Sequence, residues 1–368
     1  MIASRPQTLL YLWLLLIGFG VIAVASVSVH LANSWLNPMF IRHVGYAFLS
    51  GVALVLAYMI PTERYCQFHR AAWLLALLLA CLVLIPGIGI ESGGGRRWIS
   101  LHYFTIQVSE VIKPLLLIFI AGYLANNFER TQRSILPLLV LLAGVGVVLG
   151  LVVLEPDFGT VAIMGTVTVA VLFLAKAKLS HLFLLGSFAL SGIGALLYLE
   201  PYRVTRLMTL LSPWEEGIKL NEGYQLTNSL ISFGRGEFTG TGLGTGLQKT
   251  FTPASHNDFI FATIAEETGV IGASIVLGLL MALVYRIGNI ARTSLRQDRC
   301  FESMLCYGVA LLIGFQALIH VGVNAGIFPT KGLTLPFISY GGNSLLVLSA
   351  LIGMVLRIDK TNELSTSK

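Results

Sequence analysis

The sequence predicts an all-α polytopic membrane protein with ten transmembrane helices. Hydrophobic residues make up 55% of the 368 residues and charged residues only 11%, whereas a soluble globular domain carries about 25% charged residues. The mean hydropathy is +0.81. The apolar residues are gathered in stretches of about 20, the length at which a helix crosses a bilayer.

These stretches follow one another along the chain with polar breaks between them. We expect helices at residues 9–31, 40–60, 71–86, 107–126, 135–154, 158–175, 180–199, 259–285, 302–327 and 335–356. The third is short. Because the first is long enough to span a bilayer and further spans follow it, we expect a retained anchor and not a cleaved signal peptide. The ten helices form one membrane domain over residues 1–368.

The basic residues predict the orientation of the chain. An even number of spans places both termini on the same side of the membrane. With the N-terminus inside, 14 of the 24 Lys and Arg residues fall in cytoplasmic segments, and the short outer segments hold only Arg42, Arg96, Arg97 and Lys331. The positive-inside rule therefore predicts an N-in, C-in protein. It also accounts for the net charge of +6, so we expect no nucleic-acid binding.

The four cysteines predict neither a disulfide nor a metal centre. Cys66 and Cys300 lie in predicted cytoplasmic loops, and Cys81 and Cys306 lie in apolar segments. The sequence contains no CxxC pair and no set of His and Cys residues at metal-ligand spacing.

Two outer segments are unusual. Residues 87–106 join a glycine run to Arg96, Arg97 and Trp98, a composition that suits either a loop dipping back toward the bilayer or a connector with an interfacial Trp. Residues 200–258 form a large extracytoplasmic loop between the seventh and eighth helices. Loops of this length are usually functional or disordered, and the interspersed apolar residues argue against disorder. We expect its glycines to serve tight turns and close backbone contacts.

Residues 251–269, FTPASHNDFIFATIAEETG, place three carboxylates at the start and in the interior of an apolar helix. Asp258 precedes the apolar run, and Glu266 and Glu267 follow within it. A carboxylate that faces hydrocarbon costs at least about 2.5–3.5 kcal/mol, so such groups usually point into the bundle or a watery cavity. We therefore expect this helix to line a site.

Several charged residues also suit a purely local structural role. Glu110 and Lys113 are three residues apart and can pair on one helix face. Asp157, after a helix-breaking proline, can cap the next helix. The spacing of Ser255 and Asp258 fits a capping box, with Asp in place of the usual Glu or Gln. From spacing alone, pairing or capping is favoured over catalysis in all three cases.

Five ordered motifs resemble the SEDS family (shape, elongation, division and sporulation) of membrane enzymes that polymerise peptidoglycan. They are GGGRRWI, QVSEVIK, LEPDFGT, HNDFIFATIAEETG and TKGLTLPFISYGGNS, and the resemblance covers essentially the whole chain. The last motif is more like the division member than the elongation member. Two positions depart from the family pattern, with Val108 in place of proline and Asn343 in place of serine, which affects local geometry more than chemistry.

The resemblance implies a glycosyltransferase that joins lipid II units with inversion at the anomeric carbon. We expect Asp258 to be the catalytic general base, because the attacking sugar hydroxyl must lose its proton to a group within about 2.6–3.2 Å. A diphosphate leaving group needs cations. The substrate-binding candidates are Arg97, Lys113, Arg203, Arg206, Lys249 and Lys331 for the diphosphate, together with Glu110, His256 and Glu266. A divalent cation, Mg²⁺ or Mn²⁺, held by Asp258 could assist, although no ligand set demands one.

The resemblance also implies a partner and a location. The partner is a class B penicillin-binding protein, the septal transpeptidase, alongside other division proteins. The location is the cytoplasmic (inner) membrane at the division septum. Three alternatives remain: a lipid II flippase, an elongation polymerase and a scaffold of the division apparatus. The flippase predicts broken helices in corresponding halves of the chain, a symmetry that we do not find in the sequence.

Overall fold

The structure is a computed structural model that describes residues 6–32, 37–92, 95–100, 105–183, 186–187, 210–215, 223–252, 254–329 and 332–366. These residues are mostly helical. The larger helices are α1 (Pro6–Ala32), α2 (Pro38–Met59), α4 (His69–Leu84), α5 (Val108–Arg133), α6 (Leu136–Leu154), α7 (Phe158–Leu174), α13 (Ile260–Arg296), α14 (Cys300–Asn324) and α15 (Gly342–Thr366). Three short helices, α3 (Thr62–Gln67), α11 (Tyr224–Gly236) and α12 (Gln248–Phe251), connect them.

Among the described residues, seven helices are long and apolar enough to cross a membrane, and α4 and α7 are shorter apolar helices. Together these nine lie at nine of the predicted spans. The predicted span at 180–199 falls mostly outside the described residues, of which 180–183 and 186–187 are helical. The protein is thus a multi-pass membrane protein, and the count of ten helices stays a prediction.

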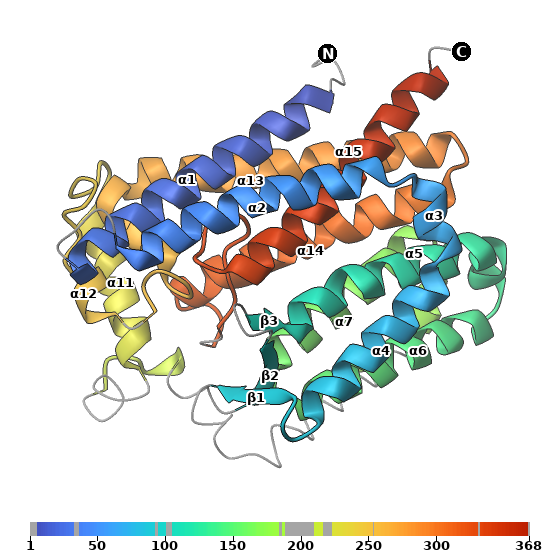
Figure 1. The fold of residues 1–368 in the computed structure, drawn as a ribbon, viewed down its shortest axis with the longest axis horizontal. Helices are drawn as coiled ribbons and strands as arrows, with labels where there is room; N and C mark the ends of the chain where they lie inside the picture. The colour runs from blue at the N-terminus through green and yellow to red at the C-terminus, as the bar shows by residue number, and fades with distance from the viewer. Residues whose placement is uncertain are drawn as a thin grey trace.

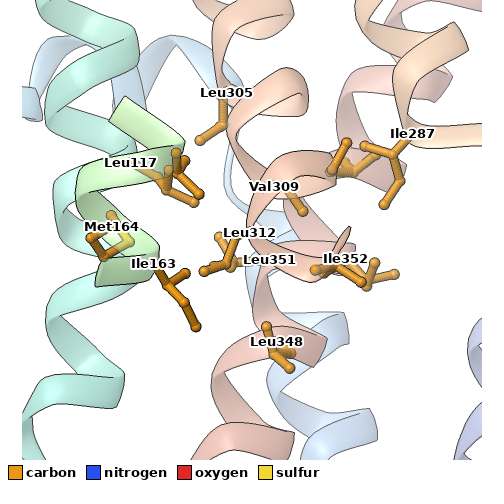
Figure 2. Close-up of a cluster of buried hydrophobic side chains, with 14 of the residues drawn as sticks. Leu117, Ile163, Met164, Ile287, Leu305, Val309, Leu312, Leu348, Leu351 and Ile352 are labelled. Atoms are coloured by element: carbon orange, nitrogen blue, oxygen red, sulfur yellow. The ribbon is translucent and has the colours of Figure 1, made fainter. Parts of the chain in front are cut away.

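The helices pack around α14 and α15, as Figure 1 shows. Helix α14 contacts α5, α7 and α13, while α15 packs along α2. Buried aliphatic side chains from these elements form the core drawn in Figure 2, including Leu117, Ile163, Met164, Ile287, Leu305, Val309, Leu312, Leu348, Leu351 and Ile352. The start of α1 and the end of α15 both lie at the top of Figure 1, and α11 and α12 lie at its left, away from them.

The segment after α4 forms a small antiparallel sheet in the order β1-β2-β3, with strands Gly89–Ser92, Gly95–Ser100 and Thr105–Gln107. Trp98 pairs with Gln107, and Ile99 lies between Gly89 and Ile106. The expectation of an all-α fold is therefore wrong here, because the described part of residues 87–106 forms a small sheet. Whether this segment dips toward the bilayer stays a prediction. The aromatic and β-branched residues Trp98, Ile99, Thr105 and Ile106 suit strands of a half-buried sheet.

The last predicted span, 335–356, begins too early, because α15 starts only at Gly342. Residues 332–341 are a non-helical loop, which we call the α14–α15 loop, and it bends at Phe337 with a φ of +65°. Its apolar side chains Leu333, Leu335, Phe337 and Ile338 are buried by protein. Hydropathy cannot distinguish burial in protein from burial in lipid, so an apolar loop is mistaken for the start of a span.

Helix α13 runs further than the predicted 259–285 and is interrupted at Gly269, where φ is +65° and ψ is −168°. The amides of Val270 and Ile271 donate to the carbonyls of Glu237 and Phe238, at the end of α11. The described part of the large loop is therefore docked on α13. Its glycines make the close contacts expected: a Cβ on Gly240 would lie 2.2 Å from the carbonyl oxygen of Glu267.

Candidate active site

Asp258 lies in a series of turns over residues 254–259 that leads into α13. The amides of Asn257 and Asp258 both donate to the carbonyl of Ala254 at 3.0 Å. The predicted cap is wrong, because the N-cap of α13 is Phe259 and no side chain at that position caps the helix. The Ser255 hydroxyl donates instead to the carbonyl of Lys249 at 3.1 Å. The Asp258 carboxylate therefore does not cap α13 and can take part in another interaction.

Asn324, the last residue of α14, holds this turn. Its amide nitrogen donates to the carbonyls of Asp258 at 2.9 Å and His320 at 2.8 Å, and its amide oxygen accepts from the Ala262 amide at 3.1 Å. Asn324 is fully buried. One side chain thus fixes the backbone of Asp258 and satisfies an amide in the first turn of α13, which would otherwise lack a partner.

Helix α14 presents further polar groups to the α14–α15 loop. Gln316 donates to the carbonyl and hydroxyl of Thr334, each at 3.0 Å, and His320 Nδ1 lies 2.6 Å from the carbonyl oxygen of Leu333. Gln316, His320 and Asn324 follow one another at intervals of four, so they share one helix face. This pattern is visible in the sequence and could have indicated a polar contact surface, but it does not say what lies opposite.

The α14–α15 loop is bonded to the turn that carries Asp258. The amide of Tyr340 donates to the His256 carbonyl at 2.9 Å, and the Ser339 hydroxyl donates to the Asn257 carbonyl at 2.8 Å. The rings of His256 and Tyr340 meet edge to face at a centroid distance of 5.6 Å. Two motifs about 80 residues apart in the chain therefore form one site.

The carboxylate of Asp258 lies against this loop. A Cβ added to Gly332 would lie 3.0 Å from Asp258 Oδ2. Burial raises the pKa of Asp258 to about 6, and within the described ranges no cation pairs with its carboxylate. Burial lowers the pKa of His256, so this imidazole is neutral at pH 7. An unpaired carboxylate with a pKa near neutrality is suited to accept a proton.

Three other predicted residues gather at the start of α5 and beside the α6–α7 turn. Lys113 and Glu110 form a buried ion pair of 2.6 Å, which confirms the predicted pairing. Arg97 on β2 donates through Nε to the Glu155 carbonyl at 3.0 Å and through Nη2 to the Pro156 carbonyl at 2.9 Å.

The α6–α7 turn that Arg97 binds contains two carboxyl groups. Asp157 accepts from the Thr160 amide at 3.1 Å and caps α7, as predicted. The side chain of Glu155 is fully buried, and burial, together with the nearby Asp157, raises its pKa to about 8 despite the opposing charge of Arg97. Glu155 is therefore mostly protonated at pH 7. This turn adjoins the α14–α15 loop, because a Cβ on Gly159 would lie 3.0 Å from the Leu333 side chain.

The two glutamates of α13 point into the protein and organise the large loop. Glu266 accepts from the amides of Leu247 at 2.9 Å and Gln248 at 3.2 Å and pairs with Arg235 at 3.2 Å. Glu267 pairs with Lys249 at 2.5 Å. Their burial confirms that these carboxylates avoid lipid.

Lys249 is buried as well, and its ammonium also donates to the carbonyl and hydroxyl oxygens of Ser26 on α1, both at 3.1 Å. Lys249 thus links α12 to α1 and α13. The three remaining cationic candidates, Arg203, Arg206 and Lys331, lie outside the described residues.

The described part of the chain contains no group of three or more His, Cys, Asp and Glu side chains arranged to hold a metal ion. A single carboxylate does not exclude one, because Mg²⁺ is commonly bound by one or two carboxylates together with phosphate oxygens of the substrate. Asp258 fits that role, and its ligand set would have to be completed by the substrate.

Comparison with known proteins identifies the family. The family described as "Cell cycle protein", whose name combines FtsW, RodA and SpoVE, matches residues 6–364. A "Probable peptidoglycan glycosyltransferase FtsW" of Coxiella burnetii is 40% identical over 347 residues, which cover 93% of this chain and 93% of that protein. The protein of the same name from Legionella pneumophila is 41% identical over 369 residues, with coverages of 98% and 93%.

A solved structure agrees with this assignment. One chain from a structure described as "structural coordination of polymerization and crosslinking by a peptidoglycan synthase complex" superposes with a TM-score of 0.78 and 27% sequence identity, and the match covers 98% of this chain and 99% of that chain. The protein therefore belongs to the FtsW/RodA/SpoVE family of cell cycle proteins, the SEDS family.

Proposed function

We propose that this protein is a peptidoglycan glycosyltransferase that polymerises lipid II at the outer face of the cytoplasmic membrane during septal cell-wall synthesis. The observation that carries the proposal is the position of Asp258. Its carboxylate lies between two bonded segments, has a pKa of about 6 and lacks a cationic partner among the described residues. The names of the relatives support the same reaction and favour the division role over elongation.

In this mechanism Asp258 removes the proton from the 4-hydroxyl of the acceptor sugar. The hydroxyl oxygen then attacks the anomeric carbon of the donor, and the bond to the lipid diphosphate breaks. Attack from the face opposite the leaving group converts the α-linked donor into a β-linked product. The diphosphate departs already ionised, so it needs cations more than a proton.

We assign the diphosphate first to Arg97, Arg203, Arg206 and Lys331. Lys113 and Lys249 are paired with Glu110 and Glu267, so binding the diphosphate would require them to exchange partners. Glu110, His256 and Glu266 are secondary candidates for contacts with the substrate. A divalent cation bound by Asp258 and the diphosphate would supply further positive charge.

We further propose ten membrane spans with both termini in the cytoplasm, which places α11, α12 and Asp258 on the outer side. The polymerase then meets the lipid II headgroup outside the cell. A class B penicillin-binding protein that cross-links the new strand is the proposed partner, since the similar solved chain comes from a complex of polymerization and crosslinking. In a Gram-negative cell the location is the inner membrane at the septum.

The test is gel analysis of labelled lipid II incubated with purified protein, alone and with its transpeptidase. Asp258→Asn should reduce glycan synthesis roughly 10²- to 10⁴-fold, because general-base catalysis contributes typically that much. The matched control is Asp298→Asn, which makes the same change at an exposed position in the turn between α13 and α14 and should leave synthesis unchanged.

Full glycan synthesis by Asp258→Asn would refute the base assignment. The flippase would be favoured if the wild type moved lipid II across vesicle membranes but made no polymer, either alone or with its transpeptidase. Parallel reactions with EDTA and with added Mg²⁺ or Mn²⁺ test whether glycan synthesis requires a divalent cation.

A further inference from the structure

The turn from α5 to α6 lies at the right of Figure 1, away from α11 and α12, and a cavity opens at this turn. Its volume is about 560 Å³. Helix α5 loses regular geometry at Asn127, where φ is −127° and ψ is 19°, and residues on both sides of this break line the cavity. The last turn of α5 and the first turns of α6 form its walls.

The lining has two chemically different sides. Arg130 and Arg133, both exposed, lie on the α5 side. Leu136, Pro137 and Val140 lie on the α6 side, and the leucine and valine are 66% and 52% exposed. Leu136 and Val140 are four residues apart, so they share one face of the helix. The cavity therefore suits an occupant with a negative head and an apolar tail.

The position of the cavity along the membrane normal agrees with this chemistry. From Val108 to Arg130, α5 extends about 33 Å at about 1.5 Å per residue, and the hydrocarbon core of a bilayer is about 30 Å thick. The guanidinium groups therefore reach the headgroup layer when the start of α5 lies at the other face. The apolar wall on α6, which runs back toward the bilayer centre, faces the acyl chains.

We propose that this cavity binds an anionic phospholipid of the leaflet that faces the chain termini. Arg130 and Arg133 hold the phosphate through charge-assisted hydrogen bonds, and an acyl chain lies along Leu136 and Val140. Glu129 is 4.0 Å from Arg133, but both side chains are more than 80% exposed, so a phosphate can replace this loose pair. A free phosphate or an acidic peptide would leave the apolar wall uncovered.

The experiment is native mass spectrometry of the purified full chain titrated with phosphatidylglycerol or with phosphatidylcholine of the same acyl chains. Arg130→Gln/Arg133→Gln should weaken binding of phosphatidylglycerol roughly thirtyfold, at about tenfold per 1.4 kcal/mol and about 1 kcal/mol per basic residue. The matched control, Arg292→Gln/Arg296→Gln, removes two exposed arginines at the same end of the molecule, on α13, and should change binding little. Thermal unfolding of each variant verifies folding.

Two further arms make the test specific. Glu129→Gln removes the competing carboxylate and should tighten binding of phosphatidylglycerol. Inorganic phosphate at millimolar concentration should not displace the lipid. The proposal is overturned if both arginine pairs weaken binding equally, if phosphatidylcholine binds as tightly as phosphatidylglycerol, if Glu129→Gln weakens binding, or if phosphate competes.

Discussion

At the scale of single residues, the carboxyl group of Asp258 is half-buried beneath the α14–α15 loop, and burial raises its pKa to about 6. Above that pH the group is mainly ionised, and in the proposed mechanism it can accept the proton of the acceptor sugar hydroxyl. Below that pH the group is mainly protonated and cannot accept this proton. The same burial that makes ionisation costly also makes the carboxylate a stronger base than an exposed aspartate.

The rate of glycan synthesis should therefore depend on pH with an acidic limb near pH 6. Below that value kcat/KM should fall on the order of tenfold per pH unit, because the deprotonated fraction falls in that proportion. The measurement is initial polymerisation rate between pH 4.5 and 8, with the folded state monitored at each pH. A flat profile from pH 5 to 7 would contradict the role of Asp258.

We expect Asn324 to act on the reaction through the position of Asp258. Asn324→Leu removes the bonds to the Asp258 carbonyl and the Ala262 amide, and each buried group left without a partner costs about 1–3 kcal/mol. We expect kcat to fall roughly 10- to 100-fold, since a displacement of about 1 Å costs up to 10²-fold.

The readout for Asn324→Leu is the split between kcat and KM. A positioning role predicts that KM stays near the wild-type value. The control Asn126→Leu changes an exposed asparagine on α5 and should alter neither constant. Equal losses in both variants, or a change confined to KM, would reject the positioning role.

At the scale of elements, the break in α13 at Gly269 joins the helix to the large loop. The φ and ψ of Gly269 lie in a region that is essentially restricted to glycine and costs other residues about 1–3 kcal/mol. A Cβ there would also lie 2.4 Å from the Phe238 carbonyl oxygen. Because Gly269 has no side chain, the amides of Val270 and Ile271 can leave the helix pattern and donate to the carbonyls of Glu237 and Phe238.

Gly269→Ala should therefore lower the free energy of unfolding by at least about 1–3 kcal/mol and loosen the large loop. Thermal unfolding and limited proteolysis of the purified protein measure the two effects. Gly278→Ala, in the same helix, is the matched control, because nothing lies within 4 Å of its added Cβ. It should be neutral or slightly stabilising. Similar behaviour of the two variants would show that the break does not depend on glycine.

The glutamates of α13 complete this connection. Glu266 binds the start of α12 and Arg235 of α11, and Glu267 binds Lys249 and Ser26. Adjacent carboxylates thus reach different partners, so that α1, α11 and α12 are all bonded to one helix. The large loop is consequently fixed close to the turn that carries Asp258.

In the whole molecule, the start of α1 and the end of α15 lie on the same side, away from α11 and α12 (Figure 1). This arrangement agrees with an even number of spans. The positive-inside rule predicts that this end faces the cytoplasm.

Cysteine labelling tests that orientation. In a variant with the four native cysteines replaced, Leu243→Cys should react with a membrane-impermeant maleimide from outside the cell, since Leu243 is 62% exposed in the large loop. Asp298→Cys, in the exposed α13–α14 turn, should react only after permeabilisation. The reverse pattern would refute the N-in, C-in topology.

Local sequence is enough to predict the membrane class, nine of the helices, the pairing of Glu110 with Lys113 and the cap at Asp157. These features depend on local composition or on residues three or four apart, and the chain displays both directly. It also singled out Asp258 through its resemblance to a family, although local spacing alone favoured a cap there.

Only the tertiary structure decided how the site is assembled. The α14–α15 loop, the polar face of α14 and the turn before α13 meet through bonds between residues 13 to 84 positions apart, such as His320 to Leu333, Asn324 to Asp258 and Tyr340 to His256. No local pattern encodes such pairings. Burial in protein and burial in lipid require the same apolar side chains, so hydropathy mistook the loop for membrane helix, and packing alone separates the two.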